Sequence, residues 1–413
     1  MKSKIFSFTV LLLLVLSGML VAAGGETDGK GSISEGMEET KTQAPQEIHD
    51  WYDLDAVRDN LGGDYVLMSD LDEDTAGYED LVDTEKGWEP IGEFGEEQVV
   101  MFNGTFDGQN HEIRSLHIDR PNETGVGVFI GSEGEIKNVG AVGVDINGGS
   151  VVAGLVASNE GIIENSYIAG KVSGNGAGGL LGLNKGPVSD SYATCDVNGE
   201  GGGGLIGANT GTISNSYATG DLSGDGGGGL LGLNRGTVVD SYAAGNVSGD
   251  EVGGLVGLNG DDATVSDSYS TGRVRGNEAI GGLVGQNIGR IENSYASGNL
   301  SGEGYNVGGL VGDNSGPIVD SFATGEVSGD DRLGGLVGSN REEATVNNSY
   351  ATGDVTGNGD VGGLAARNDG TVSDSYTMGN VSGDSDVGCF VAINFGAVEN
   401  SYSTGFVGIG TSV

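Results

Sequence analysis

The sequence predicts an all-β protein, a parallel β-helix in which short strands wind into coils that stack along one axis. A phrase close to G-G-L-V-G-x-N-x-G-x-V-x-N-S-Y-A-T-G-x-V-S-G occurs ten times between residues 150 and 408. The copies follow one another at 25 to 28 residues, a constancy typical of solenoids, in which each repeat forms one coil. Gly, Ser, Asn, Thr and Val dominate the repeats, and these residues disfavour helix.

Two other architectures with similar periods fit the repeats less well. Leucine-rich repeats need a helix-forming stretch in each unit, and none lies between the copies. A four-stranded propeller blade needs more than about 25 residues. Counting three irregular copies, we expect about thirteen coils and a rod on the order of 60 Å long.

The N-terminus has the pattern of an export signal. Lys2 and Lys4 precede an apolar run from Ile5 to Val21, and small residues follow at Ala22 and Ala23. This order predicts a signal peptide over residues 1–23. The run is also just long enough for a retained membrane anchor, so that alternative stays open. After signal cleavage we expect no membrane span.

Four further segments follow along the chain. Residues 24–47 are polar and without periodicity, which predicts a disordered linker. Ile48, Trp51, Leu54, Val57 and Leu61 share one helical face, which predicts a helix over 48–63 that caps the first coil. Irregular coils are expected over 64–149, the ten repeats over 150–408, and a tail over 409–413.

Acidic residues dominate the charge of the chain. Asp and Glu number 60 against 18 Lys and Arg, for a formal net charge of -42. This balance argues against nucleic-acid binding, because phosphates need cationic partners. It also leads us to expect a halophilic source, since concentrated salt screens such self-repulsion. Cys195 and Cys389 lie eight coils apart, roughly 38 Å, which is beyond disulfide reach.

The repeated phrase resembles the GLUG motif of secreted and surface proteins of archaea and bacteria, some of them adhesin-like. The residues that carry the resemblance are the G-G-L-V-G-x-N and N-S-Y-A-T-G segments, together with the lead-in Phe102–Gly108. It covers roughly residues 48 to 408. The resemblance implies a right-handed β-helix and is nearly silent on biochemistry.

One Asn recurs in every copy and predicts a structural ladder. Stacked about 4.8 Å apart, the Asn amides can hydrogen-bond from coil to coil. The row consists of Asn159, Asn184, Asn209, Asn234, Asn259, Asn287, Asn314, Asn340, Asn368 and Asn394.

An aromatic residue also recurs in every copy, after an invariant Ser. Alternation along a strand places Ser and Ala on the inner face and the aromatic and Thr on the outer face. An outward aromatic column could bind a glycan or a surface protein, or it could be a stacked ladder with no ligand. Tyr167 begins the row and Tyr402 ends it, and the candidate ligand face is Tyr192, Tyr217, Tyr242, Tyr269, Tyr295, Phe322, Tyr350 and Tyr376.

Acidic residues recur at the turn before each G-G-L segment, namely Asp225, Asp250, Glu278, Glu303, Asp330, Asp360 and Asp384. Carboxylates at the spacing of one coil repel one another and could recruit Ca²⁺. No dense calcium-loop motif accompanies them. A solvated acidic edge and a calcium-stiffened spacer are therefore both open, and we predict no other cofactor and no defined metal site.

No motif for catalysis is evident. The chain lacks G-x-S-x-G, H-E-x-x-H and Walker patterns, and its Arg residues are scattered. We expect His111 and His117 to be isolated surface residues, although both could share a coil with Asp107, Glu112 and Asp119. A polysaccharide-acting enzyme on the β-helix scaffold stays open as the alternative. The sequence predicts a non-catalytic, extracellular or cell-surface protein with an adhesin-like or envelope role. End-to-end self-association is a further expectation, because an open β-helix end exposes strand edges.

Overall fold

The computed structural model describes residues 44–94 and 99–409. The expected signal peptide, most of the expected linker and residues 410–413 of the tail lie outside the described residues. Within the described part, no helix is long and apolar enough to cross a membrane.

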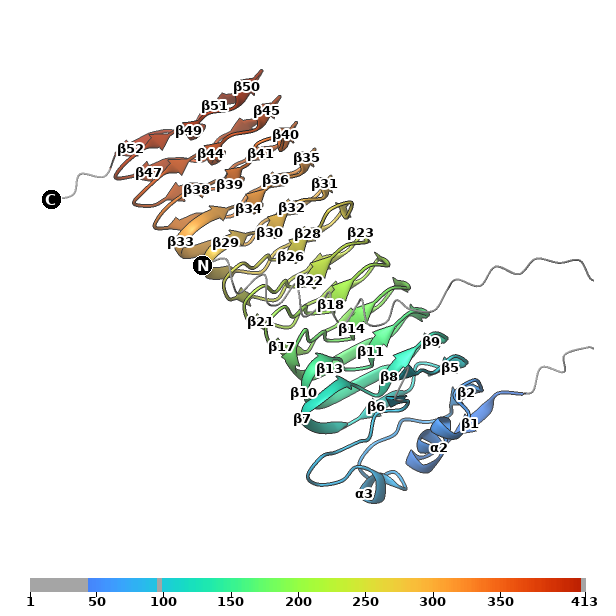
Figure 1. Cartoon of the computed structure of the whole chain (residues 1–413). Coiled ribbons are helices and arrows are strands. Elements are labelled where there is room, and N and C mark those ends of the chain that lie inside the picture. Colours follow the sequence, from blue (N-terminus) through green and yellow to red (C-terminus); the bar gives the residue numbers. More distant parts are fainter. Residues whose placement is uncertain (1–43, 95–98, 410–413) are drawn as a thin grey trace, which may run out of the picture.

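The chain forms a parallel β-solenoid of about 12 turns, close to the thirteen expected. Figure 1 shows the coils stacked into a rod, with the helices beside the first coils at the N-terminal end. Each regular coil has three sides, and each side pairs in parallel with the same side of the next coil. One side ends in the recurring Asn, and we call it the Asn face. Another begins with the recurring aromatic, and we call it the Tyr face. The remaining side is the third face.

The Asn face is an 11-stranded sheet whose ladder Asn residues are in register from one strand to the next. Its strands are β8 (Phe129–Ser132), β11 (Val156–Asn159), β14 (Leu181–Asn184), β18 (Ile206–Asn209), β22 (Leu231–Asn234), β26 (Val256–Asn259), β30 (Val284–Asn287), β34 (Val311–Asn314), β39 (Val337–Asn340), β44 (Ala365–Asn368) and β49 (Val391–Asn394).

The third face is a 14-stranded sheet, and β1 and β2 from the N-terminal region form its first edge. Its strands are β1 (Gln46–Ile48), β2 (Asp64–Leu67), β5 (Thr105–Asp107), β9 (Glu135–Lys137), β12 (Ile162–Glu164), β15 (Pro187–Ser189), β19 (Thr212–Ser214), β23 (Thr237–Val239), β27 (Thr264–Ser266), β31 (Arg290–Glu292), β35 (Pro317–Val319), β40 (Thr345–Asn347), β45 (Thr371–Ser373) and β50 (Ala397–Glu399).

The Tyr face carries short aromatic strands followed by strands of the V-S-G segment and the turn. Its strands are β6 (Glu112–Arg114), β7 (His117–Val126), β10 (Gly140–Val152), β13 (Tyr167–Asn175), β16 (Tyr192–Ala193), β17 (Asp196–Asn198), β20 (Tyr217–Ala218), β21 (Leu222–Ser223), β24 (Tyr242–Ala243), β25 (Val247–Ser248), β28 (Tyr269–Ser270), β29 (Val274–Gly281), β32 (Tyr295–Ala296), β33 (Leu300–Gly308), β36 (Phe322–Ala323), β37 (Val327–Gly329), β38 (Leu333–Gly334), β41 (Tyr350–Ala351), β42 (Val355–Thr356), β43 (Val361–Gly362), β46 (Tyr376–Thr377), β47 (Val381–Gly383), β48 (Val387–Gly388), β51 (Tyr402–Ser403) and β52 (Val407–Ile409). A separate antiparallel pair joins β3 (Glu93–Phe94) and β4 (Val99–Val100).

The N-terminal helix is present but shorter than the predicted 48–63. Helix α2 spans Trp51–Asp55, and a 3-10 turn, η1, spans Ala56–Asp59. The Asp50 carboxylate accepts the backbone N–H of Asp53 and so starts the helix at Trp51. The prediction was also wrong at Ile48, which belongs to β1 and pairs with Leu67. Gln46 and Glu47, which we expected to belong to the linker, are also part of β1.

Helix α2 closes the apolar interior at the N-terminal end of the solenoid. Trp51, Leu54 and Val57 are buried and belong to the same core that runs through the coils. The Trp51 ring lies 5.4 Å from that of Tyr78, in the second helix α3 (Tyr78–Leu81), and 5.5 Å from that of Trp88. The sequence did not predict α3.

The glycine that follows the aromatic-Ala-Thr segment permits the close stacking of the Tyr face. A Cβ added at Gly245 would lie 1.8 Å from the carbonyl oxygen of Gly220 in the preceding coil. Gly353 has the same relation to Gly325, at 1.9 Å. Cys195 occupies this row in an earlier coil, where burial raises the pKa of its thiol to about 12. Cys195 and Cys389 are both free thiols.

Candidate functional site

The recurring Asn residues form the predicted ladder along the edge of the Asn face. From Asn159 to Asn394, each side-chain amide donates to the amide oxygen of the next coil, at 2.7–3.0 Å. All are buried except Asn394 at the last coil. At the other end Ser132 stands in register with Asn159, and the amide oxygen of Asn159 has no hydrogen-bond partner among the described residues.

The recurring Ser residues form a second polar row, which links the coils at the corner before the Tyr face. From the sequence we expected these Ser residues only to be small and inward-facing. The backbone N–H of Ser191 donates to the hydroxyl oxygen of Ser216 at 3.2 Å, and the same contact recurs in later coils. The residue before each Ser is Asn or Asp in the left-handed region, for example Asp190 at φ 52° and Asn215 at φ 49°. Asn and Asp tolerate these angles, which explains the N/D-S pair.

The aromatic column faces outward, as predicted, and the preceding Ser and following small residues are buried. Nine successive ring pairs stack from Tyr167 to Tyr402, with centroids 4.8–5.4 Å apart and interplanar angles of 1–10°. Burial raises the pKa of Tyr192, Tyr242, Tyr295 and Tyr350.

This stacking restricts what the aromatic column can bind. Each interior ring has both faces against neighbouring rings, so only ring edges and hydroxyls face solvent. At the N-terminal end of the column, Gly140 lies against the Tyr167 ring. A Cβ added to Gly140 would lie 2.4 Å from the Cζ atom of that ring. Tyr402 at the other end is 55% exposed. A sugar that needs an open aromatic face has no such face between Tyr192 and Tyr376.

The acidic turn residues do not form the single column that the sequence suggested. The strand register places Glu278 beside Tyr305 of the next coil, not beside Glu303. Asp360 directly precedes Val361, and Val361 pairs with Leu333, so Asp360 does not stack on Asp330. Two of these carboxylates accept backbone N–H groups of the next coil: Asp225 from Asp250 and Asp250 from Asn277, both at 3.0 Å. Among the described residues, no group of three His, Cys, Asp or Glu side chains is arranged to hold a metal ion.

A polar cluster lies at the N-terminal end of the aromatic column. Asp70 binds His111 (Oδ1 to Nδ1, 3.1 Å) and Arg114 (Oδ2 to Nη2, 2.9 Å), while Glu112 accepts from Arg114 and from the Tyr167 hydroxyl. Burial raises the pKa of Tyr167, and the bond to Glu112 raises it further. The sequence did not single out Asp70, and His111 is not the isolated residue that we expected, because strand register brings it to Asp70.

His117 lies apart from this cluster. Its nearest acidic partner is Asp145, at 4.0 Å in the neighbouring strand β10. The two histidines therefore have different carboxylate partners, and the alternative grouping with Asp107, Glu112 and Asp119 does not form.

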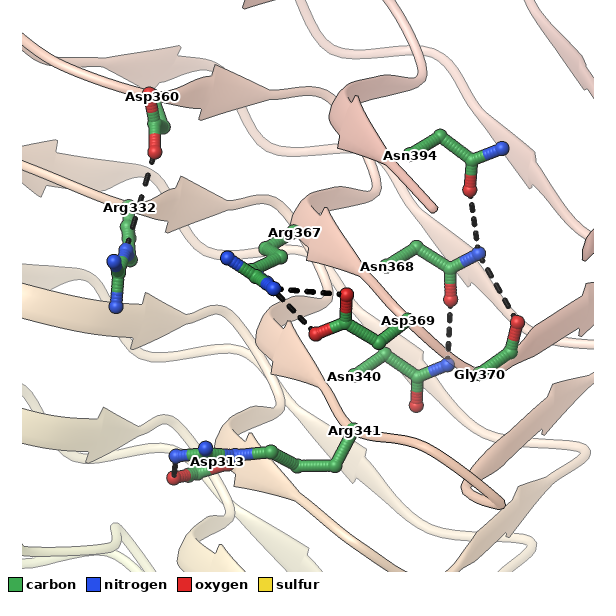
Figure 2. Close-up of polar contacts among 10 residues, drawn as sticks. All are labelled: Asp313, Arg332, Asn340, Arg341, Asp360, Arg367, Asn368, Asp369, Gly370 and Asn394. Atoms are coloured by element: carbon green, nitrogen blue, oxygen red, sulfur yellow. Dashed lines mark hydrogen bonds and ion pairs between the residues drawn. The ribbon is translucent and has the colours of Figure 1, made fainter. Parts of the chain in front are cut away.

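A charged cluster of three Arg–Asp pairs spans the C-terminal coils, with two pairs on the outer side of the Asn face and one at the turn before it (Figure 2). The Arg341 Nε donates to Asp313 Oδ1 at 2.6 Å, and a second bond joins the same two side chains. Arg367 makes two bonds to Asp369, at 2.7 and 3.0 Å. The third pair joins Arg332 and Asp360, which directly precede β38 and β43; the Arg332 Nε lies 3.9 Å from Asp360 Oδ2. The sequence analysis found these Arg residues scattered. The partners of Arg332 and Arg341 come from neighbouring coils, whereas Arg367 pairs with Asp369 two residues along its own coil.

A surface depression of about 520 Å³ adjoins this charged cluster. It is lined by Gln286, Asn287, Ile288, Asp313, Ser315, Arg341, Glu342 and Asp369, which come from four successive coils. The turn Asn340–Val346 is two residues longer than the turn Asn314–Ile318, and it places Arg341 and Glu342 beside the hollow. The sequence signal for this feature is the repeat spacing of 28 residues from Phe322 to Tyr350, the longest in the aromatic row.

The fold and these rows define a class: a repeat β-solenoid whose coils are joined by side-chain ladders. Three stretches, residues 249–275, 276–301 and 330–356, match the family model described as the GLUG motif. The chain therefore carries GLUG motif repeats, as the resemblance implied.

Two relatives are similar over about a third of the chain. Halomucin of Haloquadratum walsbyi is 34% identical over 137 residues, 32% of this chain and 2% of that protein. A protein of Evansella cellulosilytica named "Putative Gly-rich membrane protein" is 34% identical over 146 residues, 34% of this chain and 16% of that protein. The chain thus corresponds to a small part of either relative.

Among solved structures, a Bacteroides ovatus chain titled "putative immunoglobulin A1 protease" is similar at 23% identity and a TM-score of 0.45. The similarity covers 58% of this chain and 77% of that chain.

Proposed function

We propose that this chain is a non-catalytic, exported interaction protein of the cell surface or envelope, with a glycan or another surface protein as its partner. The observation that carries the proposal is that the side chains of the repeated rows contact the next coil. Asn amides and Ser groups hydrogen-bond to it, and Tyr rings stack on it. The solenoid is therefore a scaffold, and its binding residues are the few outer side chains that the ladders do not use.

Two further observations support an envelope location. The relatives are halomucin and a protein named as a membrane protein. The formal net charge of -42 suits an environment of concentrated salt. On the same grounds we propose a halophilic source, and unfolding upon removal of salt is the expected behaviour.

Fractionation of the source cells tests this proposal. We expect the chain in the envelope or extracellular fraction, accessible to added protease on intact cells, with its N-terminus near residue 24. A cytoplasmic chain that retains Met1 would contradict export. A chain that keeps its stability after complete desalting would contradict the halophilic source.

A polysaccharide-acting enzyme is the second candidate, and the polar cluster of Asp70, His111, Glu112, Arg114 and Tyr167 favours it. These side chains combine a histidine held by a carboxylate with a tyrosine, types that serve in general acid–base catalysis, and an arginine pairs with the same carboxylate. Release of products from neutral or uronic-acid polymers, abolished by His111→Ala, would establish this activity and overturn the non-catalytic proposal.

Contact between rod ends is also part of the proposal. In the last described coils the side chains of Phe395 and Phe406 are 72% and 80% exposed, and exposed apolar groups at a strand edge favour association. Sedimentation velocity at several concentrations should show self-association, which the double variant Phe395→Ser, Phe406→Ser should remove. A monomer at all concentrations would contradict this part.

A further inference from the structure

We propose that the depression on the Asn face, lined by Gln286, Ile288, Asp313, Ser315, Arg341, Glu342 and Asp369, is a binding site for a neutral glycan. The proposal deepens the interaction role described above and rests on it. It moves the expected ligand contacts away from the aromatic column, whose ring faces are stacked, and onto the outer side of β30, β34, β39 and β44.

The depression arises from the different lengths of the turns that follow the ladder Asn residues. The turns Asn287–Ile291 and Asn314–Ile318 are short, while Asn259–Val265 before them and Asn340–Val346 after them are each two residues longer. The longer turns include Asp262 at φ 60° and Glu343 at φ 69°. Two long turns thus bracket two short ones, and the hollow of about 520 Å³ lies over the short ones, against Arg341 and Glu342. Its size is within the ~300–1,000 Å³ typical of ligand sites.

The polar groups of the site are held in place before any ligand arrives. The two bonds between Arg341 and Asp313 fix both side chains, and Arg367 fixes Asp369 through its own pair of bonds. The Arg367 guanidinium in turn lies over the Phe395 ring, 5.0 Å from its centroid. Planar bidentate pairs add geometric specificity, and side chains that are already ordered lose less entropy when a ligand binds.

The charge balance of the site favours a neutral ligand. Asp313 and Asp369 are each neutralised by a guanidinium, so Glu342 is the lining carboxylate for which the described residues give no cationic partner. No unpaired positive charge is left to attract phosphate, sulfate or a uronate. The paired groups still offer free N–H donors and oxygen lone pairs.

Sugar hydroxyls match this surface, since each hydroxyl both donates and accepts a hydrogen bond. The amide of Gln286 and the exposed hydroxyl of Ser315 add two further groups that do both. Ile288, 46% exposed at the same site, offers an apolar contact for the C–H face of a sugar ring. The combination of a few fixed polar groups with one apolar contact is typical of binding sites for small polar ligands.

The test is a binding screen of the full chain against neutral oligosaccharides of glucose, mannose, galactose and xylose. Matched uronic-acid and sulfated oligosaccharides are included, and affinities are measured by calorimetry at one fixed salt concentration. Ser315→Tyr fills the hollow without changing charge, and Arg341→Ala removes the guanidinium. Thr210→Tyr and Arg235→Ala make the same changes at the equivalent positions of earlier coils, outside the depression. Circular dichroism checks that each variant is folded.

We expect at least one neutral oligosaccharide to bind. Ser315→Tyr should abolish that binding and Arg341→Ala should weaken it at least tenfold, while the two control variants change it less than twofold. Binding that survives Ser315→Tyr and Arg341→Ala would overturn the proposed location. Binding of anionic sugars alone, or of no oligosaccharide, would overturn the ligand class. Cell fractionation gives its result independently, so the surface role can hold even where this site fails.

Discussion

The outer side of the Asn face differs between its first and its later regular coils. In the first coils, the residue before the ladder Asn is Leu183, Ala208 or Leu233, and these pack with Val151 and Ala157 in an apolar cluster separate from the main core. In the later coils the same position holds Gln286, Asp313, Ser339 and Arg367, and it is apolar again at Ile393 in the last coil. The core and the Asn ladder continue unchanged through both sets.

This comparison shows which positions hold the fold and which carry individual chemistry. The inward rows and the ladders are alike in every coil because each must match the coil before it and the coil after it. The outer position before the Asn has no such constraint, so it can change from apolar to charged within one rod. Function is therefore expected where neighbouring coils differ.

The largest expected effect comes from the glycine row of the Tyr face, which should be equally sensitive in both sets of coils. Gly245→Ala and Gly353→Ala each place a Cβ 1.8–1.9 Å from a carbonyl oxygen of the preceding coil. We expect each to lower the free energy of unfolding by about 3–4 kcal/mol, near the upper end for single substitutions. Urea unfolding followed by circular dichroism measures this. A large effect in one set and none in the other would break the claim that this row is uniform.

A smaller effect is expected from the Asn ladder. Asn234→Ala and Asn340→Ala each leave a buried donor and a buried acceptor of the neighbouring amides without a partner, at a cost of about 2–3 kcal/mol. Asn394→Ala, at the exposed end of the ladder, is the matched control and should cost far less. Equal costs at Asn394 and Asn234 would mean that burial does not set the strength of the ladder.

The smallest expected effect is a pH dependence of stability at the boundary between the two sets of coils. There Glu251 takes the left-handed turn position that Gly226 occupies in the preceding coil. Burial, with the nearby carboxylates of Glu278, Asp225 and Asp250, raises the pKa of Glu251 to about 7. The unfolded carboxyl titrates at about 4.3. Between these values the folded chain keeps a proton that the unfolded chain has lost, so stability should fall as pH rises towards 7 and slightly above.

Melting temperatures at pH 5 and pH 8 test this prediction. Glu251→Gln should reduce the loss of stability between these two pH values, because the amide cannot ionise. Glu303→Gln, at an exposed carboxyl of a turn two coils further on, should leave the loss as it is in the parent chain. An unchanged pH profile in Glu251→Gln would show that other carboxylates cause the dependence.

Much of the fold could be predicted because each repeated row has a simple physical role. The spacing predicts the coils, the Asn row its ladder, and the alternation around Ser and Ala the outward aromatics. The handedness, implied by the resemblance, stays a prediction. The helix was predicted too long because Ile48 continues its apolar face in sequence, whereas the backbone of Ile48 pairs with β2.

The candidate site was harder to predict because its residues meet across coils. Asp313 and Arg341 are 28 residues apart, and their contact depends on the register of β34 with β39. Turn lengths decide that register and also shape the hollow. The aromatic row was read as a candidate ligand face because a sequence shows which side a ring faces but not whether its faces are free.

The pairing of like with like between coils has a consequence for how such a rod can change in length. Asn meets Asn, Ser meets Ser and ring meets ring at every junction of the ten regular coils. The upper surface of a coil therefore fits the lower surface of any other. Duplication or deletion of one whole repeat would rebuild the same Asn, Ser and ring junctions, so the length of the rod can change by one coil at a time without redesign of the ladder contacts.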